Sequence, residues 1–126
     1  MHRSRLAGFI IDCKTEDLES AARFWSDALG YPLKPVEKEP SPSYRQLMTP
    51  QDEIHIEVQK VAHESRLHLD IEADDIEAEV RRLEGLGARR VQQIHSWWVM
   101  EAPTGQRFCV VRVQRGDFAE KAHEWP

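Results

Sequence analysis

Three polar residues of the sequence, His55, Glu57 and His68, stand in segments that have the pattern of β-strands. His55 and Glu57 alternate with apolar residues, so both side chains point to one face, away from the side that packs on helices. His68 is followed by Leu69 and Asp70 on a second predicted strand. Imidazole and carboxylate groups on such faces hold a divalent metal ion or form hydrogen bonds with a polar ligand. Both chemistries remain open.

Cys109 offers a third kind of chemistry. It lies in a predicted strand, and Arg107 is on the same face of that strand. A strand cysteine is usually a small buried apolar residue. A neighbouring cation and a base such as His68 would instead make its thiol a nucleophile.

Two adjacent tryptophans, Trp97 and Trp98, also lie in a predicted strand, so their rings point to opposite faces. A ring on the polar face would offer a flat apolar wall to a ring-bearing ligand. The alternative is that both rings belong to the core or to a dimer contact. We name Trp98 as the candidate ligand contact beside His68, His55 and Glu57, with Trp97 as its alternative.

An internal repeat positions these residues. The stretch 11–30 resembles the stretch 69–87 in residue types and in the order strand, acidic turn, helix, Leu-Gly. Apolar residues at helical spacing mark one helix face in each half: Leu18, Ala21, Ala22, Trp25 and Leu29, and Ile76, Val80, Leu83 and Leu86. We predict that Thr15 and Asp74 cap these helices and that Gly30 and Gly87 end them.

Further strands are predicted after each helix, which gives each half the order β-α-β-β-β. In the first half they cover residues 32–36, 44–49 and 53–61, and in the second half 89–94, 97–101 and 107–114.

Composition bounds the class of protein. The chain has 126 residues, of which 40% are hydrophobic and 31% charged, so we expect one domain over residues 1–126. Its modules are expected at about 5–61 and 66–114, followed by a tail at 115–126 that Trp125 either docks or leaves exposed. The net charge of -5 argues against general binding to nucleic acid or to anionic membranes.

Cellular location is inferred from two further features. The longest apolar run, Leu6 to Ile11, is too short for a membrane span or a signal-peptide core. Two cysteines cannot form a disulfide framework, so a cytoplasmic location is the expectation.

Several segments in this order resemble the vicinal oxygen chelate superfamily, the glyoxalase/bleomycin-resistance/dioxygenase fold, and within it the glyoxalase-like domain branch. The likeness covers about Arg5 to Gln114 and rests on Asp17-Leu18 through Phe24-Trp25, Leu29-Gly30, Arg66-Leu67-His68-Leu69-Asp70, Leu86-Gly87-Ala88 and Ala102 through Val111. The resemblance implies an α+β fold with two paired βαβββ modules, which form a curved mixed sheet cup with helices on the convex side.

The resemblance also bears on metal binding. Many relatives place His, Glu or Gln metal ligands on the first and last strands of each module. Here the first strand offers no ligand around Ala7 to Phe9, and Cys109 stands where a carboxylate is expected. The implied metal site is therefore incomplete, and no cofactor is assigned.

The leading hypothesis is a cytoplasmic, homodimeric glyoxalase-like protein that binds a small organic molecule in the sheet cup without a complete metal site. The first alternative is a divalent-metal-dependent lyase, isomerase or extradiol-type dioxygenase in which His55, Glu57 and His68 hold the ion. The second alternative is a non-catalytic dimerising interaction domain.

Overall fold

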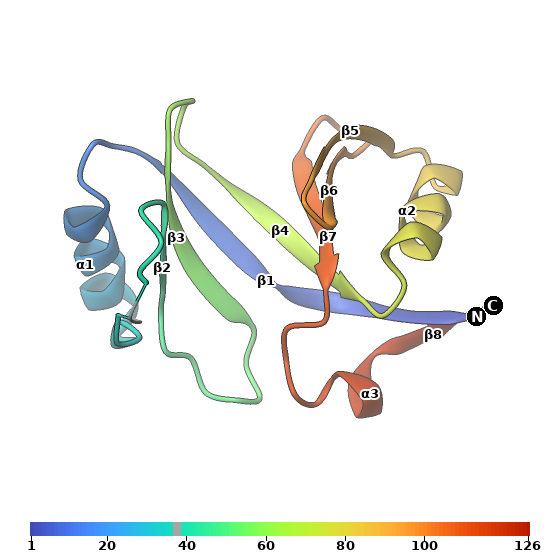
Figure 1. Ribbon diagram of the computed structural model, residues 1–126, viewed down its shortest axis with the longest axis horizontal. Coiled ribbons are helices and arrows are strands. Elements are labelled where there is room, and N and C mark those ends of the chain that lie inside the picture. Colours follow the sequence, from blue (N-terminus) through green and yellow to red (C-terminus); the bar gives the residue numbers. More distant parts are fainter. Residues whose placement is uncertain (37–38) are drawn as a thin grey trace. The chain divides into compact units, whose positions relative to one another are not determined.

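The computed structural model describes residues 1–36 and 39–126. These residues form an α+β fold, as predicted (Figure 1). The second half has the predicted order β-α-β-β-β, whereas the first half has β-α-β-β. The elements are β1 (His2–Lys14), α1 (Leu18–Leu29), β2 (Tyr44–Gln46), β3 (His55–Val61), β4 (Arg66–Ala73), α2 (Ile76–Gly85), β5 (Arg89–Ile94), β6 (Trp97–Glu101), β7 (Arg107–Arg112), α3 (Phe118–Lys121) and β8 (His123–Trp125).

The chain divides into two compact units, which are described separately. The α2 unit comprises residues 1–8 and 68–126, and the α1 unit comprises residues 9–67. The long strand β1 contributes its beginning to the α2 unit and its end to the α1 unit. The expectation of a single domain with modules at 5–61 and 66–114 stays a prediction.

In the α2 unit the strands lie in the order β1-β4-β7-β6-β5. β4 and β7 pair in parallel, whereas β6 is antiparallel to both β5 and β7. β8 pairs with the beginning of β1, so the chain end is part of the sheet. The sheet of this unit is therefore mixed.

The core of the α2 unit lies between α2 and one face of these strands. Val80 and Leu83 of α2 are buried together with Met100 and Val110 of the sheet, and Trp98 packs against them. Their spacing is the helical and strand periodicity that the sequence predicts. Leu86 is an exception to the predicted helix face, because it follows α2 and is 68% exposed.

In the α1 unit the strands lie in the order β2-β3-β1, and their core contains Ile11, Leu47 and Ile56. Trp25 of α1 packs against this cluster, as its helical spacing predicts. The predicted strand 32–36 is wrong, since only Leu33 forms a bridge, to Leu47. Pro32 and Pro35, both within this segment, remove backbone donors, which disfavours a regular strand.

The cap predicted for the first helix is also wrong. Asp17 is the N-cap of α1 and accepts a hydrogen bond from the Ser20 backbone N–H at 3.1 Å. Thr15 instead accepts from the Asp17 N–H at 3.0 Å, so it stabilises the turn that precedes the helix. Gly30 ends α1 with φ 78°, as predicted.

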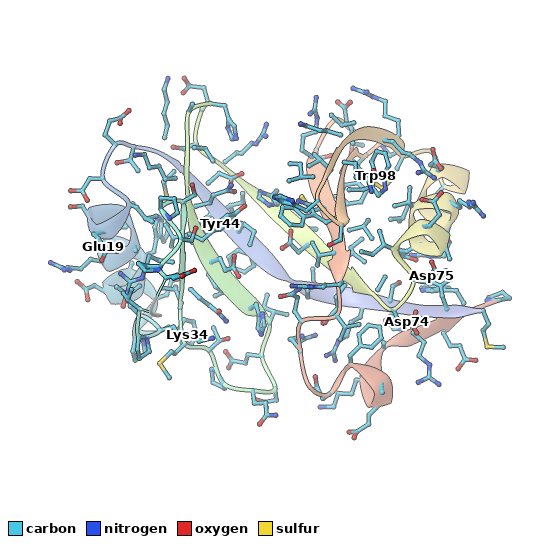
Figure 2. The ribbon with its side chains drawn as sticks, viewed as in Figure 1. Glu19, Lys34, Tyr44, Asp74, Asp75 and Trp98 are labelled. Atoms are coloured by element: carbon cyan, nitrogen blue, oxygen red, sulfur yellow. The ribbon has the colours of Figure 1, made fainter. Side chains whose placement is uncertain are left out.

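The second helix shows the same kind of displacement. Asp75 caps α2 by accepting from the Ala78 N–H at 3.0 Å, whereas the predicted cap Asp74 accepts from the Arg3 N–H at 2.8 Å (Figure 2). Asp74 therefore links the turn before α2 to β1. Gly87 adopts φ 107° just after the helix, which agrees with its predicted role.

A buried ionic cluster joins the chain ends to α2. The Glu79 carboxylate accepts hydrogen bonds from Arg82 at 2.7 and 2.9 Å and contacts His2 Nε2 at 2.8 Å. The Arg82 guanidinium lies 3.9 Å from the centre of the Trp125 ring, and the Trp125 indole N–H donates to Ser4 Oγ at 2.8 Å. Trp125 therefore docks the tail, which the sequence left open.

Burial alone would raise the pKa of Glu79, but hydrogen bonds from Arg82, His2 and Ser4 outweigh it and lower the pKa below the ordinary 4.5. A carboxyl whose pKa is lower in the folded state stabilises the fold above its unfolded pKa. That contribution is lost as the pH falls from 4.5 through the lowered pKa.

We predict that Glu79→Gln lowers the free energy of unfolding by about 3–5 kcal/mol at pH 7, because Arg82 loses its charged partner at a buried position. The difference between variant and wild type should shrink as the pH falls from 4.5 through the lowered pKa of Glu79, because folded wild-type Glu79 then takes up a proton as well. Urea unfolding at pH 7 and at a pH below 4.5 measures the free energy of unfolding of both proteins. Glu124→Gln, which alters an exposed pair with Arg3, is the control; an equal loss in both variants would contradict the prediction.

Candidate polar site on strands β4 and β7

One face of the α2 unit carries the candidate site, which we call the polar face. It is the side of β4, β7 and β6 opposite the core, and it bears His68 and Asp70, Arg107 and Cys109, and Trp97 and Val99. The parallel register sets Asp70 opposite Cys109, and the antiparallel register sets Val99 opposite Cys109. Strand alternation then brings residues from three strands to one surface.

Three of these side chains form a tight group. The ligand-type atoms of His68, Asp70 and Cys109 all lie within 4.8 Å of one another. His68 Nε2 is 3.6 Å from Asp70 Oδ1. The His68 and Asp70 side chains are 14% and 21% exposed, and Cys109 is half-buried. The group is thus held by the sheet and still reaches solvent.

Imidazole, carboxylate and thiol together form a versatile polar group. The imidazole and thiol donate or accept hydrogen bonds, and the carboxylate accepts them. This arrangement can bind a polar ligand from several directions. It also contains the thiol and imidazole that the sequence suggests as nucleophile and base.

The same group fits a divalent metal ion. Nitrogen, oxygen and sulfur donors suit zinc and similar borderline ions, and three protein ligands with an open position are typical of catalytic zinc sites. The ligand set differs from the predicted His55, Glu57 and His68, because only His68 belongs to this group.

The other predicted site residues lie elsewhere. His55 and Glu57 are on β3 in the α1 unit, where their side chains alternate with buried Ile56 and Val58 as predicted. Their convergence with His68 stays a prediction. Trp98 packs on the α2 core with the Arg90 guanidinium 4.9 Å from its ring centre (Figure 2). A ligand contact of Trp98 therefore also stays a prediction, and Trp97 is the tryptophan of the polar face.

Glu57 lines a pocket within the α1 unit. The pocket has a volume of about 160 Å³ and is bordered by Tyr44 and Gln46 of β2 and by Lys34 (Figure 2). Gln46 stands opposite Glu57 in the antiparallel register of β2 and β3. Glu57 is therefore close to other polar side chains of its own unit.

Sequence patterns only partly reveal the polar group. The even spacing of His68 and Asp70 places both on one strand face, which the sequence shows. The closeness of Cys109 depends on the parallel pairing of β4 with β7, which no local pattern reports.

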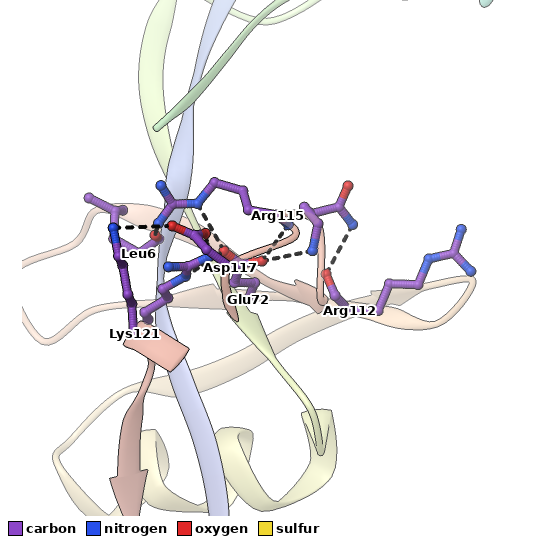
Figure 3. Close-up of polar contacts among 8 residues, drawn as sticks. Leu6, Glu72, Arg112, Arg115, Asp117 and Lys121 are labelled. Atoms are coloured by element: carbon purple, nitrogen blue, oxygen red, sulfur yellow. Dashed lines mark hydrogen bonds and ion pairs between the residues drawn. The ribbon is translucent and has the colours of Figure 1, made fainter. Parts of the chain in front are cut away.

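A saturated buried carboxylate borders the polar face on β4. Glu72 Oε1 accepts from the backbone N–H groups of Gln114 and Arg115 at 2.7 and 3.0 Å, and Oε2 accepts from Arg5 and Arg115 at 3.0 and 3.2 Å (Figure 3). Arg5 also donates to Asp117 at 2.6 Å. This network ends β7 at Arg112, earlier than the predicted Gln114, and fixes the tail against β4.

The fold and this polar face define the class of protein. Repeated β-α-β-β units in an α+β fold are those of the glyoxalase/bleomycin-resistance/dioxygenase superfamily. The chain belongs to the glyoxalase-like domain family, whose model matches residues 8–111. The resemblance seen in the sequence is confirmed.

Solved structures share this fold at low sequence identity. Methylmalonyl-CoA epimerase from Mycobacterium tuberculosis is 20% identical with a TM-score of 0.58, over 86% of this chain and 87% of that one. A glyoxalase/bleomycin resistance protein/dioxygenase superfamily member from Vibrio splendidus is 17% identical with a TM-score of 0.50, over 87% and 99% of the chains.

A third structure, described as an NAD-dependent benzaldehyde dehydrogenase from Legionella pneumophila, is 9% identical with a TM-score of 0.60, over 84% and 99% of the chains. These likenesses show the fold. No curated protein matches the chain. Among the described residues, no helix is both long and apolar enough to cross a membrane.

We predict that Glu72→Met releases the segment after β7. Hydrogen bonds to a charged group contribute about 1.5–3 kcal/mol, so the Gln114 and Arg115 amide protons should exchange about tenfold to a hundredfold faster. Hydrogen exchange measures this, and Glu120→Met on the exposed side of α3 is the control. Unchanged exchange at both amides in folded Glu72→Met would contradict the anchoring role.

Proposed function

We propose that this glyoxalase-like protein binds a small organic molecule on the polar face, with His68, Asp70 and Cys109 as polar contacts. One observation carries the proposal: three chemically different side chains from two strands meet within 4.8 Å. They are partly exposed, whereas the other face of the same strands packs against α2. A few convergent polar groups on a rigid, partly apolar surface are typical of ligand sites.

The family supports this proposal. A structural neighbour at 13% identity is a methylmalonyl-CoA epimerase in complex with methylmalonyl-CoA. The fold therefore binds a small organic molecule in that protein. For this chain the ligand differs with the residues of the site, since fold alone does not set chemistry.

The remaining expectations extend the proposal. His55 and Glu57 of the α1 unit are further proposed ligand contacts, together with Trp98 or its neighbour Trp97. We infer a cytoplasmic protein that acts as a homodimer, because the family resemblance implies pairing and the two cysteines are too few for a disulfide framework.

The second candidate function is metal-dependent chemistry, and the clustering of three donors favours it. His68, Asp70 and Cys109 would hold the ion, and a bound divalent metal would supply a Lewis acid for a lyase, isomerase or dioxygenase reaction. The strands β4 and β7 would then orient these side chains, and Arg107 would orient an anionic group of the substrate.

We predict that a screen of aromatic and carbonyl compounds finds at least one that raises the Tm. A ligand that binds only the native state raises the free energy of unfolding by about 2.7 kcal/mol when its concentration is a hundred times Kd. This corresponds to a rise in Tm of several degrees. His68→Ala and Cys109→Ser should abolish the rise.

The control for this screen is His63→Ala, a histidine outside the polar face that should leave the rise intact. A rise that persists in His68→Ala and Cys109→Ser would place the ligand elsewhere. A complete lack of response in the wild type would overturn the proposed function.

For the metal candidate, we predict stoichiometric zinc or a similar divalent ion in protein purified without chelator. Asp70→Asn and Cys109→Ser should each reduce the bound metal, while Cys13→Ser, which removes a thiol packed on the α1 core, should not. Elemental analysis measures the content. Metal-free protein whose Tm does not respond to added Zn²⁺, Ni²⁺, Mn²⁺ or Fe²⁺ would exclude this candidate.

A further inference from the structure

Arg107 is the arginine of the polar face, at the edge of the group formed by His68, Asp70 and Cys109. It is the first residue of β7 and stands opposite Glu101 of β6. The parallel pairing of Leu69 with Phe108 sets His68 beside it on β4. We call residues that stand opposite one another on neighbouring strands a row. Arg107 and His68 form the row next to that of Asp70 and Cys109, and Arg107 is about 7 Å along the strand from Cys109.

Arg107 forms no ion pair with a carboxylate in the described part of the chain. Glu101, its cross-strand neighbour, forms its ion pair with Arg89. Among the arginines in residues 1–36 and 39–126, Arg23, Arg107 and Arg112 form no close ion pair, although Arg23 still lies near enough to Asp17 to interact with its charge. Arg23 and Arg112 are exposed, but Arg107 is half-buried.

A half-buried guanidinium is partly removed from water and retains five N–H donors in a planar fork. This fork matches the two oxygens of a carboxylate better than any neutral group does. His68 on the adjacent strand β4 adds a second hydrogen-bonding group. An organic anion would accept the hydrogen bonds that Arg107 and His68 can donate at this end of the polar face.

The surface beyond Arg107 is apolar on the side of β6. Val99 stands opposite Cys109, and Trp97 stands opposite Val111. At about 3.3 Å per strand residue, these rows lie about 7 and 13 Å from the row of Arg107. A flat apolar body joined to the anionic group would cover them.

The acidic groups of the face confine the anion to one end. Asp70 lies beside His68 and Cys109, and Glu72 is surrounded by Arg5, Arg115 and two backbone donors. Asp70 repels an anion from the row of Cys109, whereas Arg5 and Arg115 compensate the charge of Glu72, so the charges orient the ligand as well as attract it.

We propose that Arg107 binds the carboxylate of the ligand, and that the ligand is an aryl carboxylate whose ring extends across Val99 toward Trp97. This assignment rests on the proposed function, because it names the class of molecule that the polar face takes. Its experiment compares a matched pair of probes, biphenyl-4-carboxylate and biphenyl-4-carboxamide, by isothermal titration calorimetry.

Wild-type protein should bind the carboxylate about tenfold to a hundredfold more tightly than the amide, the range expected for hydrogen bonds to a charged group. Arg107→Gln should remove this preference and leave amide binding unchanged, while Arg107→Lys retains part of it. Arg112→Gln removes the same charge from the other face of β7 and should have no effect. Circular dichroism confirms that each variant is folded.

The outcomes separate the two proposals. Equal binding of both probes, or an equal loss for both in Arg107→Gln, overturns the carboxylate assignment. Arg107-dependent binding of phenyl phosphate without binding of the carboxylate overturns it as well. If neither biphenyl probe binds while another compound binds through His68 and Cys109, only this inference fails. If no compound binds, the proposed function fails with it.

Discussion

The parallel pairing of β4 with β7 is the constraint on which the candidate site depends. It sets Asp70 opposite Cys109 and Ile71 opposite Val110. A slip of one residue in β4 would turn its polar side chains toward α2 and its core side chains outward. Burial of Ala73 and packing of Ile71 in the core beneath α2 therefore fix the register of β4, and the register assembles the polar group. The apolar core stabilises the fold and positions the chemistry at the same time.

Two fully buried carboxylates complete this arrangement on opposite faces of the α2 unit. Glu79 binds His2 and Arg82 on the helix side, whereas Glu72 binds Arg5 and Arg115 near the polar face. Each binds at least one arginine, and removing one partner of such a buried pair costs far more than the pair itself contributes. Their main effect is specificity: they determine where the tail lies. β8 can then pair with β1 instead of leaving its edge open.

Local patterns predict the elements of this chain better than their ends. The predicted strands 89–94 and 97–101 coincide with β5 and β6, because alternating and β-branched residues between turn signals are a local property. The residue at which a helix starts is harder to predict where two side chains that can cap the helix lie close together in the sequence. Thr15 and Asp17 both have capping side chains, as do Asp74 and Asp75, and in each case the second residue caps the helix. Only tertiary contacts, such as Asp74 with Arg3, decide between neighbours.

The site shows the same limit. Alternation places His68 and Asp70 on one face of β4, and this follows from the sequence alone. Which of Trp97 and Trp98 shares that face depends on burial of Trp98 beneath α2. The contact with Cys109 joins strands that are distant in sequence, so no short pattern contains it.

The order of charges on the polar face bears on what it prefers to bind. Arg107 stands about 7 Å from the row of Cys109, where a unit charge interacts with another by about 0.6–2.4 kcal/mol for effective dielectric constants of about 80 to 20. This repels a cation held by the polar group and attracts an anion. Asp70 lies closer and acts in the opposite sense. The two charges nearly cancel for the face as a whole but remain separated along it. A ligand with one anionic end therefore experiences a strong preference for orientation, even where the net attraction is small.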